Sequence, residues 1–283
     1  MRACSRWWSP PIRREARSHI SRRRCRTRPL HDWGVAARAT IRSRTPNRFR
    51  ARQGDAGDRP DLAPLVDLMP EGKIHVDWNT RIATRSIAHD PSAVAAVATG
   101  FSWGLLDAGI TPTAKHFPGL SRVAVDTHLF AAALDAAEPD LQAVDWVPFR
   151  AVLGIPGAAI MLSHVALTAA DAGTPVSQSK RVVTDLLRDQ WGFDGIAITD
   201  DLTMGAVEQA GLCHAVVGAL NAGVDLLLVS WDTDKAYPAL RCALDAFAAG
   251  RLNRQMLERS AQRLDRLTAT KPGSADLNRA GAR

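Results

Sequence analysis

Three pairs of polar residues in this 283-residue sequence directly follow apolar runs, and their side chains are of the kinds that do chemistry. Carboxylates act as nucleophiles or general acids and bases, imidazole exchanges protons near neutral pH, and ammonium groups bind polar oxygens. Taken singly, Asp201 could instead cap a helix that begins near Leu202, and His164 could be a hydrogen-bonded core histidine. The pairs are Lys115-His116, Ser163-His164 and Asp200-Asp201.

The apolar runs before these pairs predict the strands that position them. From about residue 60, runs of four to six apolar residues alternate with helical patterns, and such runs are typical of strands buried on both faces of a parallel sheet. The carboxyl ends of barrel strands form the active-site face, so three polar pairs at that point favour a functional site. The predicted strands are LAPLVDL (62–68), ITPTAKHF (110–117), AAIMLSHV (158–165), GIAITD (195–200) and VDLLLVS (224–230).

Helix signals lie between the predicted strands. Asp90 can cap a helix that has Pro91 in its first turn and ends near Gly109. Residues 177–192 place four apolar side chains on one helical face, Val182, Val183, Leu186 and Leu187, with Gly192 as the stop. Two further helices are predicted around 234–249 and 253–268. This alternation predicts an α/β fold, either a (β/α) TIM-type barrel or a doubly wound sheet.

The positive charge is concentrated at the N-terminal end. Residues 1–54 contain 16 Arg and two acidic residues, a net charge of +14, whereas the remainder carries 20 basic and 27 acidic residues, a net charge of −7. Clustered arginine is compatible with a polyanion-binding arm or a transit-like leader, but blocks of like charge usually stay solvated. We therefore interpret residues 1–58 as a disordered or atypical segment, and we do not expect nucleic-acid binding.

Other features of the composition concern location and cofactors. No stretch approaches the ~20 apolar residues of a membrane span, and the start lacks the apolar core of a secretory signal, which predicts a soluble cytoplasmic protein. The four cysteines have no metal-ligand spacing and are interpreted as free thiols in a reducing compartment. No glycine-rich phosphate loop is present, so nucleotide binding has no support.

Four motifs together resemble glycoside hydrolase family 3, and within it the NagZ-type β-N-acetylglucosaminidases. They are KHFPG (115–119), DTH (126–128), WVPFRAVLGIPGAAIMLSHV (146–165) and LLRDQWGFDGIAITDDLTM (186–204). The resemblance covers roughly residues 60–268. It implies a (β/α) barrel domain over residues 59–270, followed by a tail over 271–283, and a mechanism that needs no metal or organic cofactor.

The resemblance also assigns roles to individual residues. Asp200 matches the catalytic nucleophile, and Asp126 with His128 matches a dyad that acts as general acid and base on a mobile loop. Asp201 matches a neighbour with an orienting or capping role. The residues that correspond to sugar-binding or pocket-lining groups are Arg85, Lys115, His116, Ser163 and His164.

The sequence departs from the family pattern in two places. The family usually continues KHFPG with His-Gly, where this chain has Leu120-Ser121, and this difference could alter the hinge of the dyad loop. Residues 1–60 also lack the Asp-x-Glu-Gly-Gly-like motif that grips the sugar. Five predicted strands fall short of about eight in a closed barrel. We therefore expect a barrel that is incomplete or irregular at its N-terminal part, with weak or absent activity.

The resemblance implies a retaining β-N-acetylhexosaminidase that acts on amino-sugar glycosides or muropeptides in cell-wall turnover. A phosphorylase of the same fold remains open, because a histidine acid/base would not repel an incoming phosphate as a carboxylate would. A β-glucosidase specificity is a further alternative. The non-enzymatic alternative is a degenerate relative with an arginine-rich tail that binds polyanions.

Overall fold

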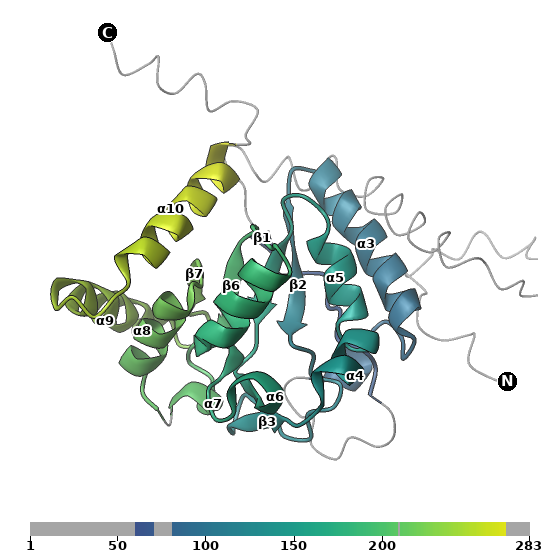
Figure 1. Ribbon diagram of the computed structural model, residues 1–283, viewed down its shortest axis with the longest axis horizontal. Coiled ribbons are helices and arrows are strands. Elements are labelled where there is room, and N and C mark those ends of the chain that lie inside the picture. The colour runs from purple at the N-terminus through teal and green to yellow at the C-terminus, as the bar shows by residue number, and fades with distance from the viewer. Residues whose placement is uncertain (1–59, 71–80, 209, 270–283) are drawn as a thin grey trace, which may run out of the picture.

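A computed structural model of the chain describes residues 60–70, 81–208 and 210–269. Within them, a curled sheet of five strands is covered by helices (Figure 1). All four strand pairings are parallel, which confirms the predicted α/β fold of an incomplete (β/α) barrel. In spatial order the strands are β1 (Pro60–Asp61), β2 (Thr111–Phe117), β4 (Ala159–Leu162), β6 (Ala197–Asp201) and β7 (Leu226–Leu228).

Four of the five predicted strands are present, but the strand predicted over 62–68 is not regular: β1 precedes it, and Leu65 forms only an isolated parallel bridge with Lys115. Beyond the two-residue β1, the chain continues alongside β2: Thr113 N donates to Ala63 O at 2.7 Å and Val66 N donates to Lys115 O at 2.8 Å. Pro64 has no N–H group to donate, and this interrupts a regular ladder.

A second, two-stranded parallel sheet was not predicted. It pairs β3 (Ala132–Leu134) with β5 (Val165–Leu167). Because β5 follows β4 after two residues, this small sheet lies at the carboxyl ends of the main strands, toward the lower end of Figure 1.

The predicted helices are largely confirmed. Asp90 caps α3 (Pro91–Asp107), where its Oδ1 accepts from Ala93 N at 2.6 Å. The helix predicted over 177–192 forms as a 3-10 turn, η2 (Val176–Gln178), and a π-helix, η3 (Arg181–Gln190), and its four apolar side chains are buried as expected. The remaining helices are α2 (Ile82–Arg85), α4 (Glu138–Ala143), α5 (Val147–Leu153), α6 (Thr168–Asp171), α7 (Gly205–Glu208), α8 (Leu212–Ala222), η4 (Thr233–Lys235), α9 (Ala236–Ala248) and α10 (Arg254–Ala269).

Aromatic side chains pack behind the end of β2. The ring of Phe117 lies 5.6 Å from that of Trp146 and 5.3 Å from that of Phe149, and the Trp146 and Trp191 rings are 5.2 Å apart. Trp146 Nε1 also donates to Pro118 O at 3.1 Å. The backbone that follows Lys115 and His116 is therefore braced by a rigid, well-packed cluster.

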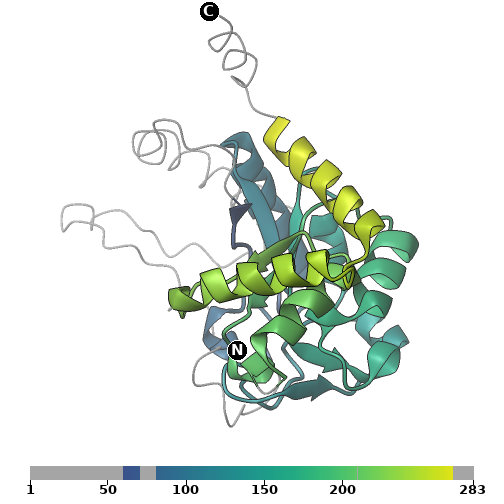
Figure 2. The same cartoon turned by 90° about the vertical axis from the view of Figure 1, so that its left-hand side faces the viewer.

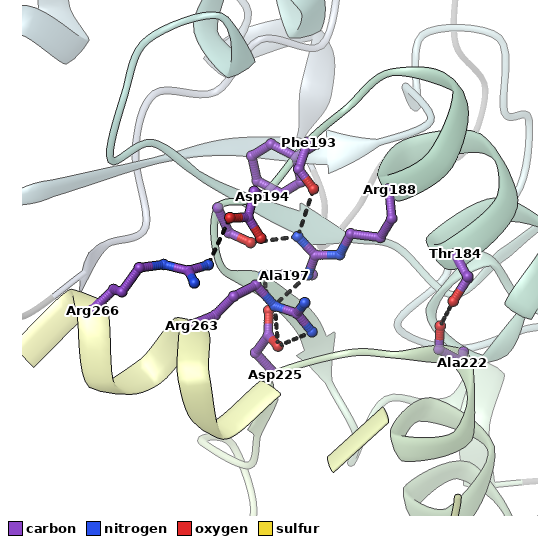
Figure 3. Close-up of polar contacts among 10 residues, drawn as sticks. Thr184, Arg188, Phe193, Asp194, Ala197, Ala222, Asp225, Arg263 and Arg266 are labelled. Carbon is purple, nitrogen blue, oxygen red and sulfur yellow. Dashed lines mark hydrogen bonds and ion pairs between the residues drawn. The ribbon is translucent and has the colours of Figure 1, made fainter. Parts of the chain in front are cut away.

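A buried charge network attaches α10 to the sheet (Figure 3). The side chain of Asp225 is fully buried and accepts from Arg188 Nη2 at 2.7 Å, from Arg263 Nε at 2.9 Å and from Ala197 N at 2.8 Å. The Arg188 side chain reaches it from η3 and that of Arg263 from α10. The network therefore links two helices to the starts of β6 and β7, at the end of the sheet opposite the polar pairs.

The helices α8 and α9 are joined by a disulfide between Cys213 and Cys242, whose Cα atoms are 5.0 Å apart. The prediction of free thiols is therefore wrong for this pair, because the packing of α8 against α9 brings together two residues that are 29 positions apart in the sequence. Figure 2 shows α9 and α10 as outer elements of the molecule.

Some predictions concern residues that the structure does not describe, namely Cys4, Cys25, the segment 1–58 and the tail 271–283. None of the helices that the structure describes has the length and apolar character needed to cross a membrane.

Candidate active site

The structure brings the predicted polar pairs to one edge of the main sheet, the lower end in Figure 1. Lys115 lies near the end of β2, Ser163 and His164 follow β4, and Asp200 lies near the end of β6. Since β4 lies between β2 and β6, the three pairs are on neighbouring strands. The strand ends therefore place these residues as the sequence predicted.

The ammonium group of Lys115 interacts electrostatically with both Arg85 and Asp200. Burial lowers the pKa of the Lys115 ammonium, the positive charge of Arg85 lowers it further, and the negative charge of Asp200 opposes both effects. Arg85 reaches this region from the last residue of α2. Lys115 thus lies within electrostatic range of a second cation and of a carboxylate, and its ammonium group is a hydrogen-bond donor suited to hydroxyl groups.

The carboxylates of Asp200 and Asp201 have different environments. Asp200 is half-buried, and its Oδ1 accepts from Asp201 N at 2.8 Å. Asp201 is buried and accepts from Thr203 N and Trp231 N, both at 2.8 Å, and from the hydroxyls of Thr203 and Ser230. Burial disfavours its ionisation, but the hydrogen bonds from Ser230 and Thr203 outweigh this and lower the pKa of Asp201 to about 2. Asp201 therefore organises the loops after β6 and β7, whereas the carboxylate of Asp200 is partly accessible to solvent.

Asp126 and His128 form a hydrogen-bonded dyad. His128 Nδ1 lies 3.0 Å from Asp126 Oδ1, and the same oxygen accepts from His128 N at 3.0 Å. The Asp126 side chain is fully buried, whereas that of His128 is 40% exposed. Because the carboxylate can only accept, Nδ1 is the donor in this bond when Asp126 is ionised, and proton exchange with a ligand falls to Nε2.

Asp67 was not singled out from the sequence, although it orders two parts of the site. Its Oδ2 accepts from His116 N at 3.0 Å and lies 2.7 Å from His116 Nδ1, while its Oδ1 accepts from Leu120 N at 2.8 Å. Asp67 ends an apolar run, the same signal that pointed to Asp200. That signal could have found it.

Asp145 anchors the loop between KHFPG and the dyad, and it too was missed. Its buried carboxylate accepts from Ser121 Oγ at 2.7 Å and from Arg122 Nε at 2.8 Å. The departure from the family pattern at Leu120-Ser121 therefore comes with its own attachment of the loop to the protein. Asp145 follows no apolar strand, so the sequence carries no local signal for it.

His164 is fully buried, and both of its ring nitrogens have partners. Nε2 donates to Asp201 O at 2.9 Å, and Nδ1 accepts from Ser177 Oγ at 2.8 Å, because a carbonyl oxygen can only accept. Burial lowers the pKa of His164, so the ring is neutral near pH 7. These contacts match the alternative of a hydrogen-bonded core histidine that supports the end of β6. Ser163 is buried next to it, and its Oγ accepts from Val165 N at 3.4 Å.

Trp231 follows β7 and is 90% exposed. Its backbone N–H donates to Asp201, so Trp231 lies close to the strand end that carries Asp200.

Over the described ranges, no group of three or more His, Cys, Asp or Glu side chains is arranged to hold a metal ion.

The sequence profile described as "Glycosyl hydrolase family 3 N terminal domain" matches residues 50–267. "Beta-hexosaminidase LpqI" of Mycobacterium tuberculosis is 33% identical over 255 residues, which are 85% of this chain and 63% of that protein. A "Beta-hexosaminidase" of Stenotrophomonas maltophilia is 38% identical over 169 residues, 59% of this chain and 48% of the relative. The chain thus spans about half to two thirds of the length of these curated relatives.

Solved structures agree with the sequence comparison. A glycoside hydrolase family 3 β-N-acetylglucosaminidase from Paenibacillus sp. superposes with a TM-score of 0.73 at 30% identity, over 84% of this chain and 43% of that one. The structure of M. tuberculosis LpqI superposes with a TM-score of 0.71 at 31% identity, over 87% of this chain and 69% of that one. Because the family profile matches residues 50–267, most of its length, this chain belongs to glycosyl hydrolase family 3.

Proposed function

We propose that this chain is a retaining β-N-acetylhexosaminidase with Asp200 as nucleophile and the Asp126–His128 dyad as general acid and base. The observation that carries the proposal is the contact between the dyad and the segment after Asp200: Gly205 N donates to His128 O at 2.8 Å. This contact supports the proposal that the half-buried carboxylate of Asp200 and the carboxylate-oriented imidazole of His128 act in one site. The printed names of the relatives, β-hexosaminidase and β-N-acetylglucosaminidase, support the same substrate class.

The proposed reaction proceeds in two steps. Asp200 Oδ attacks the anomeric carbon while protonated His128 Nε2 gives its proton to the leaving oxygen, which produces a glycosyl-aspartate. Neutral His128 then takes a proton from water, and the water oxygen attacks the same carbon and releases Asp200 with retained configuration. Lys115 and Arg85 would hold sugar hydroxyls during both steps.

The test is release of 4-nitrophenol from its β-N-acetylglucosaminide by the 283-residue chain. We expect Asp200→Asn to abolish turnover, while Asp194→Asn, an exposed aspartate at the opposite end of the sheet, leaves it unchanged. A folded wild-type protein without turnover would contradict the proposal and favour the degenerate, non-enzymatic alternative.

The natural substrate and the location are separate proposals. The resemblance favours amino-sugar glycosides such as muropeptides, and mass spectrometry of cell-wall fragments incubated with the chain would reveal loss of a terminal N-acetylhexosamine. The predicted cytoplasmic location and the Cys213–Cys242 disulfide point to different compartments, because disulfides persist mainly in oxidising ones. Fractionation of cells that express the protein decides between them.

A phosphorylase is the second candidate, and the observation that favours it is the acid/base itself. His128 is an imidazole, which unlike a second carboxylate does not repel phosphate. Product analysis with and without inorganic phosphate separates the two activities: a phosphorylase yields the sugar 1-phosphate, and a hydrolase yields the free sugar in both conditions.

A further inference from the structure

We propose that Gly205 is a positioning residue: its missing side chain lets the loop that carries the Asp126–His128 dyad rest on the first turn of α7. The inference rests on the proposed function of the dyad, and it concerns how that dyad is kept beside Asp200. It assigns a role to a residue that touches neither the nucleophile nor the dyad side chains.

Two backbone hydrogen bonds join the dyad loop to α7. Gly205 N donates to His128 O at 2.8 Å, and Ala206 N donates to Thr127 O at 3.3 Å. Both donors belong to the first turn of the helix, where N–H groups have no acceptor within the helix. The loop carbonyls supply those acceptors, so the contact serves the loop and the helix together.

The contact is too close for any side chain at position 205. A Cβ built on Gly205 would lie 2.5 Å from Leu129 O, 2.8 Å from Leu129 C and 2.9 Å from His128 O. All three are backbone atoms, so a side-chain rotation cannot relieve the overlap. The loop itself would have to move, and His128 would move with it.

The need for glycine comes from this contact and not from backbone strain. The backbone φ of Gly205 lies outside the left-handed region, so an alanine can adopt the same backbone conformation at the start of α7. An alanine at this position therefore does not strain α7, and its main effect falls on the loop.

Between the buried Thr127 and the start of β3 at Ala132, side-chain burial adds little to the attachment of the dyad loop, and beyond Ala132 the pairing of β3 with β5 holds the chain. Leu129 and Phe130 directly follow the dyad and are 49% and 55% exposed, so burial of their side chains holds the loop weakly. The opposite end is fixed separately, where Asp67 and Asp145 bind residues 120–122. Displacement by a side chain at position 205 should therefore be confined to the half of the loop that carries His128.

The test compares Gly205→Ala with Gly154→Ala by using two glycosides that differ in their need for acid catalysis. Gly154 ends α5 with helical φ and ψ, and a Cβ built on it would lie 3.4 Å from Arg150 O, its nearest contact. For a β-linked N-acetylglucosamine disaccharide, whose leaving group needs a proton, we expect Gly205→Ala to lower kcat/KM about 10²-fold. For the 2,4-dinitrophenyl glycoside, which leaves without protonation, we expect kcat/KM close to that of the wild-type protein.

Hydrogen exchange of the amides at positions 205 and 206 gives a readout that does not depend on activity. We expect faster exchange in Gly205→Ala than in the wild-type protein or Gly154→Ala. Wild-type rates on both substrates with unchanged exchange, or an equal loss on both substrates, would overturn the proposal. If the wild-type protein hydrolyses neither substrate, the proposed function fails, and hydrogen exchange alone still decides whether Gly205 holds the loop.

Discussion

At the scale of single residues, the carboxylate of Asp67 connects His116, a proposed sugar-binding residue, to Leu120 at the start of the loop that carries the proposed dyad. We expect Asp67→Asn to lower both stability and activity, because an amide presents an N–H₂ group to donors on His116 and Leu120. Hydrogen bonds to a charged group contribute about 1.5–3 kcal/mol, and the free energy of unfolding should fall by about that amount in urea titrations. The exposed Asp185→Asn serves as the control, and equal effects of the two substitutions would contradict this role.

The carboxylate of Asp201 should make stability depend on pH. Its pKa is lowered from 3.8 to about 2 in the folded protein, so the unfolded state binds the proton more readily. The stabilisation is complete above pH 3.8 and is lost as the pH falls toward 2. Urea unfolding midpoints of the wild-type protein and of Asp201→Asn should therefore differ most near neutral pH and converge in acid. A difference that does not change with pH would show that ionisation of Asp201 does not stabilise the fold.

The residues that the sequence could identify are those at the ends of apolar strands. Lys115 and Asp200 lie at the ends of buried strands, on the edge of the sheet proposed as the active site, and the proposed role of each comes from the resemblance of the motif around it. His164 also follows a buried strand, yet its ring is itself buried and contacts Ser177 and the backbone of Asp201. Burial of an individual side chain depends on packing across strands, which a local pattern does not contain.

At the scale of elements, α10 offers a matched pair of ion pairs (Figure 3). Arg263 and Arg266 both bind an aspartate, but the Arg263–Asp225 pair is buried, whereas the side chains of Arg266 and Asp194 are 55% and 72% exposed. Removing one partner of a buried pair costs about 3–5 kcal/mol, and breaking an exposed pair about 0–1 kcal/mol.

We therefore expect Arg263→Ala to reduce the free energy of unfolding several-fold more than Arg266→Ala does. Urea titration of the two variants measures the difference. Similar values would indicate that Arg188 alone satisfies the buried Asp225.

The elements that the sequence predicted well are those with many residues and clear ends. The helix α3 has a capping aspartate and a proline at its start, and the strand β2 is a seven-residue buried run. The strands β3 and β5 have three residues each, too few for a periodic pattern, and they pair across about 30 residues of sequence. The π-helical form of η3 was equally hidden, because its apolar face fits an ordinary helix.

At the scale of the whole molecule, the Cys213–Cys242 disulfide joins α8 to α9. Closing a loop between residues 29 positions apart is expected to stabilise the fold by about 3.6 kcal/mol. Peptide mapping without reductant should find the two cysteine peptides linked, and dithiothreitol should lower the free energy of unfolding by that amount. A Cys213→Ala variant provides the control, since its stability should not respond to the reductant. Unlinked peptides and an unchanged wild-type stability would contradict the bond.

The general architecture could be predicted because its parallel strands are continuous apolar runs separated by capped helices. Five strands were expected after residue 60, and five make up the main sheet of the described residues. Although its place after an apolar run could have identified Asp67 as a candidate, the contacts of Asp67, Asp145 and Gly205 with the dyad loop could not be predicted, because the three residues meet the loop from separate parts of the chain. Contacts between residues so far apart in the sequence depend on how the whole sheet curls, which local sequence patterns do not specify.

The exposed indole of Trp231 gives the site an optical label of its own. Indole emission depends on solvent contact, and among the tryptophans that the structure describes Trp231 is 90% exposed, while Trp146 is fully buried and Trp103 is 37% exposed. Its backbone is tied to Asp201, the residue after Asp200. The difference spectrum between the wild-type protein and Trp231→Phe would therefore isolate light emitted at the rim of the site, and occupancy by a sugar could be followed without a labelled substrate.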